Sequence, residues 1–164
     1  MIVDEHKREG EVVPEPQEPE DEDGGLQKRL LSAERIVHES DSVPYRLFGS
    51  ECLRVERLYL LNGAPYIYYT HYLPAMLVEV DLSALQEQSL YRFIKENDIE
   101  LANFRDEFSV SSAPPRFEEL LTLDKEAQVL RMLRFSYDDM GNLVEYSEGY
   151  YNTAMQLYVV HFDE

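Results

Sequence analysis

The sequence predicts an α+β domain in which a largely antiparallel β-sheet is flanked by helices on one face. Two β-rich runs at residues 52–61 and 64–73 flank Asn62-Gly63, the strongest short-range signal for a β-hairpin. Further strand-like runs follow in the second half of the chain, around a second turn sequence at residues 138–142. Helical spacing with capping residues occurs only in short segments. Many strands joined by turns, together with few helices, are typical of this fold class.

The first 25 residues differ from the rest of the chain. They contain ten acidic residues against two basic ones, three prolines and no aromatic residue. Such a segment cannot bury enough apolar surface to offset the entropy lost on ordering. We therefore expect residues 1–25 to form a disordered acidic tail rich in Pro and Glu, and residues 26–164 to form one folded domain.

The segments before the hairpin are short. Residues 30–38 fit either a strand or a helix, and hydrophobic periodicity does not distinguish the two. Residues 42–49 predict a short helix, with Ser42 as its N-cap and Gly49 as its stop. After the hairpin, Pro74 ends the second strand because proline cannot donate a hydrogen bond to a ladder.

Helices and strands alternate in the second half. Residues 89–96 predict a helix with Ser89 as its N-cap and apolar residues spaced for one buried side. Residues 99–112 form a long strand-like stretch, and Pro114-Pro115 introduces a second helix over residues 116–123. Three more strands are expected, at residues 128–137, 143–151 and 156–162.

Charge and composition exclude several classes of function. The 164 residues include 15 Lys and Arg against 33 Asp and Glu, which gives a formal net charge of −18. Nucleic-acid binding needs basic residues against phosphates, and an anionic membrane repels such a chain. Cys52 is the single cysteine, and no apolar run reaches the ~20 residues of a membrane span. We therefore expect a cytoplasmic domain that by itself contacts neither nucleic acid nor membrane.

Sequence motifs for catalysis, metals or cofactors are missing. The four histidines are scattered, and no two of them lie four residues apart. The patterns His-Glu-x-x-His and Gly-x-Ser-x-Gly and the Gly-rich phosphate loop do not occur. Zinc needs a cluster of Cys and His residues, which this sequence does not contain. We therefore expect no catalytic residue, no metal site and no cofactor.

Two features fit either structural packing or the binding of a ligand. Five of the 12 tyrosines lie between positions 59 and 72, where they either pack a hairpin or line a pocket with rings and hydroxyls. Arg57 stands in a strand rich in Leu, Val and Tyr, and a buried arginine requires an anionic partner. Strand alternation places Arg57 with Tyr59, and Glu145 with Tyr151, on common faces. An Arg57–Glu145 contact would be a structural ion pair, which the pattern alone favours, or a pair that orients a small ligand.

Six motifs occur in an order that is similar to a known family. The first is Arg57-Leu-Tyr-Leu-Leu-Asn-Gly-Ala-Pro65, followed by Tyr72-Leu73-Pro74 and by Ser89-Leu-Tyr-Arg-Phe-Ile94. The others are Phe117-Glu-Glu-Leu-Leu-Thr-Leu123, Gln128-Val-Leu-Arg-Met-Leu-Arg134 and the stretch from Tyr137 through Gly141-Asn-Leu-Val-Glu-Tyr-Ser147 to Tyr151. Over residues 28–162 the chain resembles the UTRA domain, the effector-binding half of the HutC branch of GntR-type bacterial transcription regulators. The resemblance implies the fold of chorismate lyase.

The resemblance also implies a ligand site. In members that sense sugar phosphates, two arginines of the first hairpin strand bind the anion; the first falls on Arg57, whereas Tyr59 replaces the second. Tyr69 replaces a carboxylate of the return strand, so the positive charge of the site is reduced and a less charged ligand is as compatible as a phosphorylated sugar. The implied ligand-binding residues are Arg57, Tyr59, Tyr69, Ser89, Tyr91, Glu145 and Tyr151.

The resemblance implies partners as well. The implied effector is a small molecule, with an anion such as a sugar phosphate or an organic acid among the candidates, and the domain is expected to form homodimers. Family regulators carry a winged-helix DNA-binding domain before this one, but no helix-turn-helix pattern precedes Leu26 here. We therefore expect this chain to make no direct contact with operator DNA.

Two alternatives stand beside the regulatory domain. A chorismate-lyase-like enzyme would use Glu148, which lies near the place where that fold keeps a catalytic carboxylate. A ligand-free protein would act by pairing with a full-length regulator, or would bind a basic partner through its acidic tail.

Overall fold

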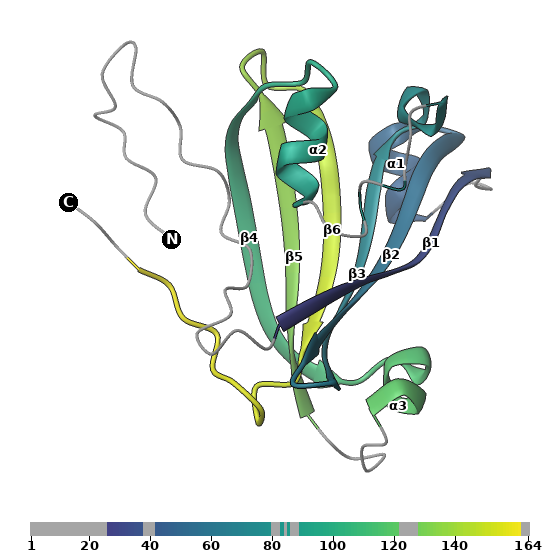
Figure 1. Cartoon of the computed structure of the whole chain (residues 1–164). Helices are drawn as coiled ribbons and strands as arrows, with labels where there is room; N and C mark the ends of the chain where they lie inside the picture. Colours follow the sequence, from purple (N-terminus) through teal and green to yellow (C-terminus); the bar gives the residue numbers. More distant parts are fainter. Residues whose placement is uncertain are drawn as a thin grey trace.

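The computed structural model describes residues 26–37, 42–79, 83, 85, 89–121 and 128–161, and this part of the chain forms one antiparallel sheet (Figure 1). The strand order is β1-β2-β3-β6-β5-β4, and all five neighbouring pairs are antiparallel. The strands are β1 (Leu26–Val37), β2 (Glu51–Leu61), β3 (Ala64–Pro74), β4 (Leu101–Ser112), β5 (Gln128–Asp138) and β6 (Leu143–Tyr151). The predicted α+β class is confirmed, and the ambiguous segment at residues 30–38 belongs to strand β1, with His38 outside the described residues.

Short helices connect the strands. They are α1 (Val43–Phe48), the 3₁₀-helix η1 (Ala75–Glu79), α2 (Leu90–Glu96) and α3 (Pro115–Leu121). The predicted N-caps are confirmed, because the Ser42 hydroxyl accepts the Tyr45 N–H at 3.1 Å and the Ser89 hydroxyl accepts the Arg92 N–H at 3.0 Å. Gly49 ends α1 with φ of 85°, a conformation that glycine adopts without strain. None of the described helices has the length and apolar character needed to cross a membrane.

The two hairpins have the turn chemistry that their sequences predict. Asn62 and Gly63 have φ of 52° and 82°, both positive, as a tight two-residue hairpin turn requires. In the second hairpin the Asp138 carboxylate accepts the backbone N–H of Met140 at 3.0 Å and of Asn142 at 2.8 Å. Local hydrogen bonds of this kind make aspartate a frequent turn residue.

The chain runs twice through the same order of elements. A strand, a helix and a hairpin appear as β1-α1-β2-β3 and again as β4-α3-β5-β6. The two halves join where β3 pairs with β6, from Ile67 opposite Tyr151 to Tyr72 opposite Tyr146. Side chains from the first hairpin therefore meet side chains from the second in the centre of the sheet.

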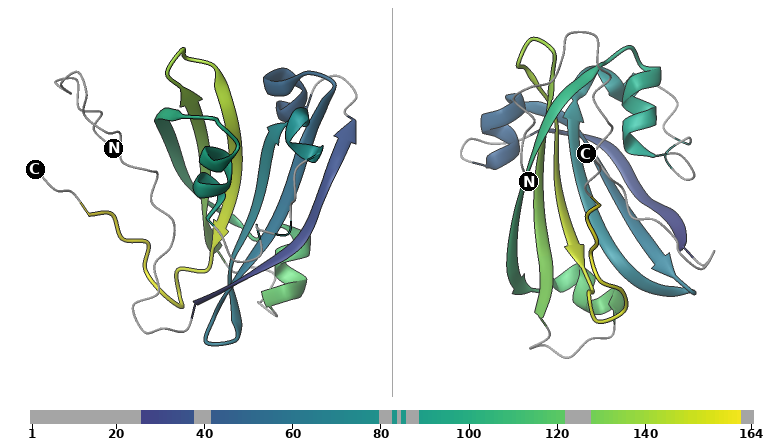
Figure 2. Two further views of the ribbon diagram at one scale, coloured as in Figure 1. Left: turned by 45° about the horizontal axis from the view of Figure 1, so that its top comes forward. Right: turned by 90° about the vertical axis from the view of Figure 1, so that its left-hand side faces the viewer.

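Helices cover both faces of the sheet, not one face as the sequence suggested. Leu90, Phe93 and Ile94 of α2 pack with Leu53 and Val55 of β2, near one end of the sheet. Phe117 of α3 packs with a different set, near the other end, made of Leu58, Leu60, Tyr68 and Val129 (Figure 2). Val55 and Leu58 lie three positions apart in one strand, so they point to opposite faces. Below, the face under α2 is called the inner face.

The strand expected at residues 156–162 is wrong for the described part of that segment. Residues 152–161 follow β6 without pairing to any strand, and residue 162 lies outside the described residues. The physical reason is the strand order: β6 already has β3 on one side and β5 on the other, so no edge is open beside it. Tyr158 packs against the rings of Phe108 and Tyr151, whereas Leu157 and Val160 are exposed. The expected tail at residues 1–25 also lies outside the described residues.

Candidate functional site

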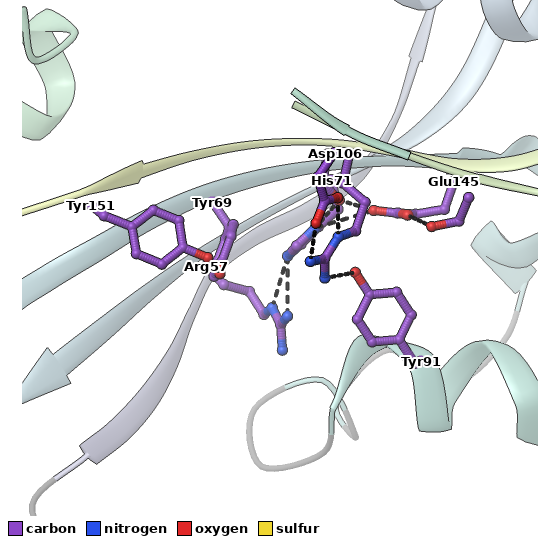
Figure 3. A network of polar contacts seen from close by, with 10 residues as sticks. Arg57, Tyr69, His71, Tyr91, Asp106, Glu145 and Tyr151 are labelled. Carbon is purple, nitrogen blue, oxygen red and sulfur yellow. Dashed lines mark hydrogen bonds and ion pairs between the residues drawn. The ribbon is translucent and has the colours of Figure 1, made fainter. Parts of the chain in front are cut away.

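A row of buried polar side chains crosses the inner face of the sheet from β2 to β4 (Figure 3). Strand register explains the row, because residues directly opposite each other on neighbouring strands point to the same face. His71 lies opposite Ser147, Ser147 opposite Arg134, and Arg134 opposite Asp106. The members are Arg57 of β2, His71 of β3, Glu145 and Ser147 of β6, Arg134 and Ser136 of β5, and Asp106 of β4.

Arg57 and Glu145 are connected through two other side chains. Arg57 donates from Nε and from Nη2 to Nε2 of His71, both at 3.1 Å. Because this ring nitrogen accepts, the proton of neutral His71 is on Nδ1, which lies 2.6 Å from Oγ of Ser147. Ser147 in turn donates to one oxygen of Glu145, and Ser136 donates to the other. The predicted Arg57–Glu145 relation is thus a hydrogen-bonded relay, with His71 and Ser147 between the two charges.

Burial keeps His71 neutral. Desolvation lowers its pKa well below the usual 6.5, and the positive charges of Arg57 and Arg134 lower it further. Only 2% of His71 is exposed. A neutral ring fits the relay, since a protonated ring would present a donor to the Arg57 donors.

The neutral state of His71 predicts a pH-dependent stability. Its folded-state pKa is below the unfolded value of about 6.5, so the unfolded chain takes up a proton first as the pH falls. The contribution of His71 is complete above pH ~6.5 and is lost below it, by about 1.4 kcal/mol between pH 7.5 and 5.5. Urea unfolding at both pH values measures this loss. We expect it to shrink by that amount in His71→Gln and to persist in His161→Gln, an exposed control; an unchanged pH dependence in His71→Gln would contradict the assignment.

Arg134 is the second buried cation of the inner face. Its Nε and Nη2 donate to the two oxygens of Asp106 at 2.6 and 2.7 Å, in a pair whose side chains are 3% and 7% exposed. Its Nη1 donates to the hydroxyl of Tyr91 at 2.9 Å. Its guanidinium carbon also lies 5.0 Å from the ring centre of Phe104. Arg134 therefore connects the edge strand β4 to α2 and fixes where Tyr91 stands above the sheet.

Tyrosines fill the inner face beside Arg57. The ring of Tyr69 stacks on His71 with centroids 5.1 Å apart and meets Tyr59 and Tyr151 edge-on, at 5.2 and 5.6 Å. The hydroxyls of Tyr69 and Tyr151 are hydrogen-bonded to each other. Burial raises the pKa of both phenols well above 10, so both stay protonated. A Cβ at Gly149 would stand 2.6 Å from Cε1 of Tyr69, so glycine gives this ring its space.

Most residues that the sequence singled out meet on this face. Arg57 lies over the ring of Tyr59, with Cζ 5.3 Å from the ring centre, and Tyr59 contacts Tyr69. Tyr91 reaches the face from α2 through its bond to Arg134. Ser89 starts the same helix, and its hydroxyl caps the helix. That these residues contact a ligand remains a prediction.

Sequence reasoning missed five members of the row. Arg134 lies between the apolar residues Leu133 and Phe135 in a predicted strand, and this signal could have been used to find it. His71 follows Tyr69 at the spacing of one strand face. Asp106, Ser136 and Ser147 join only through strand register, which the sequence does not reveal.

Glu148 does not belong to this site. It lies three positions after Glu145 on β6 and therefore points to the opposite face, where it accepts the Tyr146 hydroxyl at 2.8 Å. A carboxylate in that position cannot act together with Arg57. The location expected for a lyase-like catalytic carboxylate is thus on the wrong side of the sheet.

In the described part of the chain, the inner face carries hydrogen-bonding and charged groups. These groups are not arranged as a nucleophile with a free base. Nε2 of His71 is taken by Arg57, and the Ser147 proton is directed to Glu145. Within the described residues no three His, Cys, Asp or Glu side chains are grouped as a metal site would need. Fold and site together define an α+β domain with a buried polar network on the inner face of its sheet.

Comparison with known proteins places the chain in a family. The model of the UTRA domain matches residues 24–155, and the chain belongs to this family. A structure described as a transcriptional regulator from Streptomyces coelicolor is similar over 85% of this chain and 97% of its own, with a TM-score of 0.73 and 29% identity. The chain is thus a regulatory effector-binding domain, and the expectation that it is not an enzyme is confirmed.

Two further structures share the fold. One is described as the ligand-binding domain of a GntR-family transcriptional regulator from Bordetella bronchiseptica; it has 21% identity and a TM-score of 0.71 over 88% of this chain and 93% of its own. The other is PhnF from Mycobacterium smegmatis, with 22% identity and a TM-score of 0.69 over 85% of this chain and 64% of its own.

Proposed function

We propose that this domain is the sensor of a HutC-type regulator and binds a small anionic effector on the inner face of the sheet, beneath α2. One observation carries the proposal: Arg57 is a cation that is only 1% exposed on the inner face, and two hydrogen bonds to His71 fix the orientation of its guanidinium. Figure 3 shows the third nitrogen of Arg57 pointing away from His71, toward the side from which α2 approaches. Buried, pre-oriented arginines are suited to bind carboxylate or phosphate groups.

The relay supports this role by fixing the guanidinium before any ligand arrives. An arginine side chain loses substantial rotamer entropy when it is immobilised, and a ligand that had to order it would bind more weakly. Here the bonds from His71 through Ser147 to Glu145 hold Arg57 in advance. Glu145 therefore acts on the effector through the relay.

The remaining predicted residues complete the site. Tyr59, Tyr69 and Tyr151 form an aromatic wall beside Arg57, which suits the body of an organic ligand. Tyr91 and Ser89 approach from α2, and the Tyr91 oxygen already accepts from Arg134.

A thermal-unfolding panel tests the proposal. Sugar phosphates, amino-sugar phosphates, aromatic acids and chorismate are added in turn, and an effector at one hundred times its Kd adds about 2.7 kcal/mol and raises the Tm by several degrees. We expect Arg57→Gln, in which an amide N–H still reaches His71, to abolish the shift. Arg54→Gln is the matched control, because Arg54 lies on the opposite face of β2 in a pair with Glu34. A shift that survives in folded Arg57→Gln would contradict the site.

Homodimer formation is a separate part of the proposal and rests on the family resemblance. Light scattering of the purified chain is expected to give about twice the 19.2 kDa of the monomer. A monomeric mass at micromolar concentration would contradict this part and leave the effector site in place.

A further inference from the structure

Five large apolar side chains are exposed together at one corner of the sheet. Nine such side chains are exposed in the described residues, and the other four are scattered over β1, α1, η1 and the turn between β5 and β6. The five are 45–73% exposed and are called the corner patch below. They are Phe108 and Val110 of β4, and Leu157, Val159 and Val160 of the segment that follows β6.

A ring contact joins the two segments of the corner patch. Tyr158 packs on Phe108 with ring centroids 5.3 Å apart, and on Tyr151 at 5.1 Å. The Tyr66 hydroxyl donates to the Gln156 carbonyl at 3.1 Å and so ties the same segment to β3. Figure 1 shows the segment after β6 on the β4 side of the sheet. The two parts of the patch are therefore neighbours in space, although they are far apart in the sequence.

The two segments carry no charged side chain. Residues 108–112 and 152–160 contain no Asp, Glu, Lys, Arg or His, in a chain whose net charge is −18. Two copies of such an acidic chain repel each other over most of their surfaces. An uncharged apolar surface is where two copies approach with the least repulsion, and where the burial of apolar area favours association.

The two edges of the sheet differ in the same way. β1 forms one edge and carries Lys28, Arg29, Glu34 and Arg35, and charged side chains on an edge strand discourage pairing with another chain. β4 forms the other edge and ends in the uncharged residues 108–112. On its outer side, β4 pairs with no strand of the described residues. This edge is therefore the one that is open to a second chain.

We infer that the corner patch is the surface through which two copies of this chain associate, with their β4 edges next to each other across a two-fold axis. The inference rests on the homodimer part of the proposed function and names its interface. A two-fold axis sets the same surface of both copies against itself, so apolar side chains meet apolar side chains. The interfaces of homodimers are more apolar than the rest of a protein surface, which is the character of this patch.

Lysine substitutions on the two edge strands test the inference by sedimentation velocity of the full chain over a range of micromolar concentrations. Val110→Lys places an ammonium group in the patch, and we expect it to raise the Kd of the dimer at least about 100-fold. The added positive charge reduces the net charge of −18, so overall repulsion cannot cause this loss. Val37→Lys is the matched control on β1, because Val37 is 68% exposed and Val110 is 69% exposed. The control is expected to keep the wild-type Kd.

A second pair of variants tests the other segment of the patch. Leu157→Lys is expected to weaken the dimer as Val110→Lys does, and Met140→Lys in the exposed hairpin turn is expected to leave it unchanged. Circular dichroism shows that each variant is folded. A wild-type Kd in folded Val110→Lys or Leu157→Lys overturns the inference and leaves the homodimer in place, and an equal rise in either control also overturns it. A monomeric wild-type chain overturns the homodimer and its interface together.

Discussion

Replacement of Asp106 by asparagine is expected to lower the free energy of unfolding by about 3–5 kcal/mol. Asp106 takes two hydrogen bonds from Arg134, and the side chains of the pair are 7% and 3% exposed. Asparagine removes the negative charge and leaves the guanidinium buried without its counter-ion. Urea denaturation of wild-type and variant protein measures the loss.

Two controls separate the buried charge from other effects of this substitution. Glu107→Gln on the same strand breaks a pair with Arg105 whose side chains are 60% and 51% exposed, so its cost is expected to stay below about 1 kcal/mol. The double variant Asp106→Asn with Arg134→Met removes both charges and is expected to recover much of the lost stability. A loss below about 1 kcal/mol in Asp106→Asn would contradict the buried pair.

Replacement of Glu145 by alanine is expected to cost a similar amount, about 3–5 kcal/mol. The Glu145 carboxylate is fully buried and accepts from Ser136 and Ser147. Alanine leaves both hydroxyls without this acceptor and removes the charge that balances Arg57 at the far end of the relay. Chemical denaturation measures the change.

Glu148→Ala is the matched control for Glu145. Glu148 lies on the same strand but on the opposite face, is partly exposed and accepts a single hydrogen bond from Tyr146. Its loss is expected to cost about 1 kcal/mol. Equal losses in the two variants would mean that the relay contributes nothing beyond an ordinary hydrogen bond.

Features determined by neighbours in sequence were predictable. The Asn62-Gly63 hairpin and the caps Ser42 and Ser89 depend on turn geometry and on hydrogen bonds within a few residues. The strand predicted at residues 156–162 was wrong because the alternation of apolar and polar residues is a local pattern. Strand pairing depends instead on an open sheet edge beside the segment. The prediction that all helices cover one face was wrong for a related reason. The loops that connect α3 to the strands decide which face Phe117 covers, and the sequence of the helix itself does not.

The candidate site was predictable in part. Arg57, Glu145 and Tyr151 were found by residue type and by strand alternation, and the structure places them on one face. The relay was not found, because it depends on the register that puts His71 opposite Ser147. The sequence pattern favoured a direct ion pair between Arg57 and Glu145. The structure instead connects them by hydrogen bonds through His71 and Ser147, so Glu145 acts on Arg57 indirectly.

Calorimetric titration of Arg57→Gln tests the central claim most directly. The ligand is the anion that raises the Tm of the wild-type protein most, and the samples are wild type, Arg57→Gln and Arg54→Gln, each shown to be folded by circular dichroism. We predict that Arg57→Gln raises the Kd at least about 100-fold, which corresponds to about 2.7 kcal/mol for a charge-assisted contact, and that Arg54→Gln matches wild type. Wild-type affinity in folded Arg57→Gln would contradict the assignment of the effector site to the inner face.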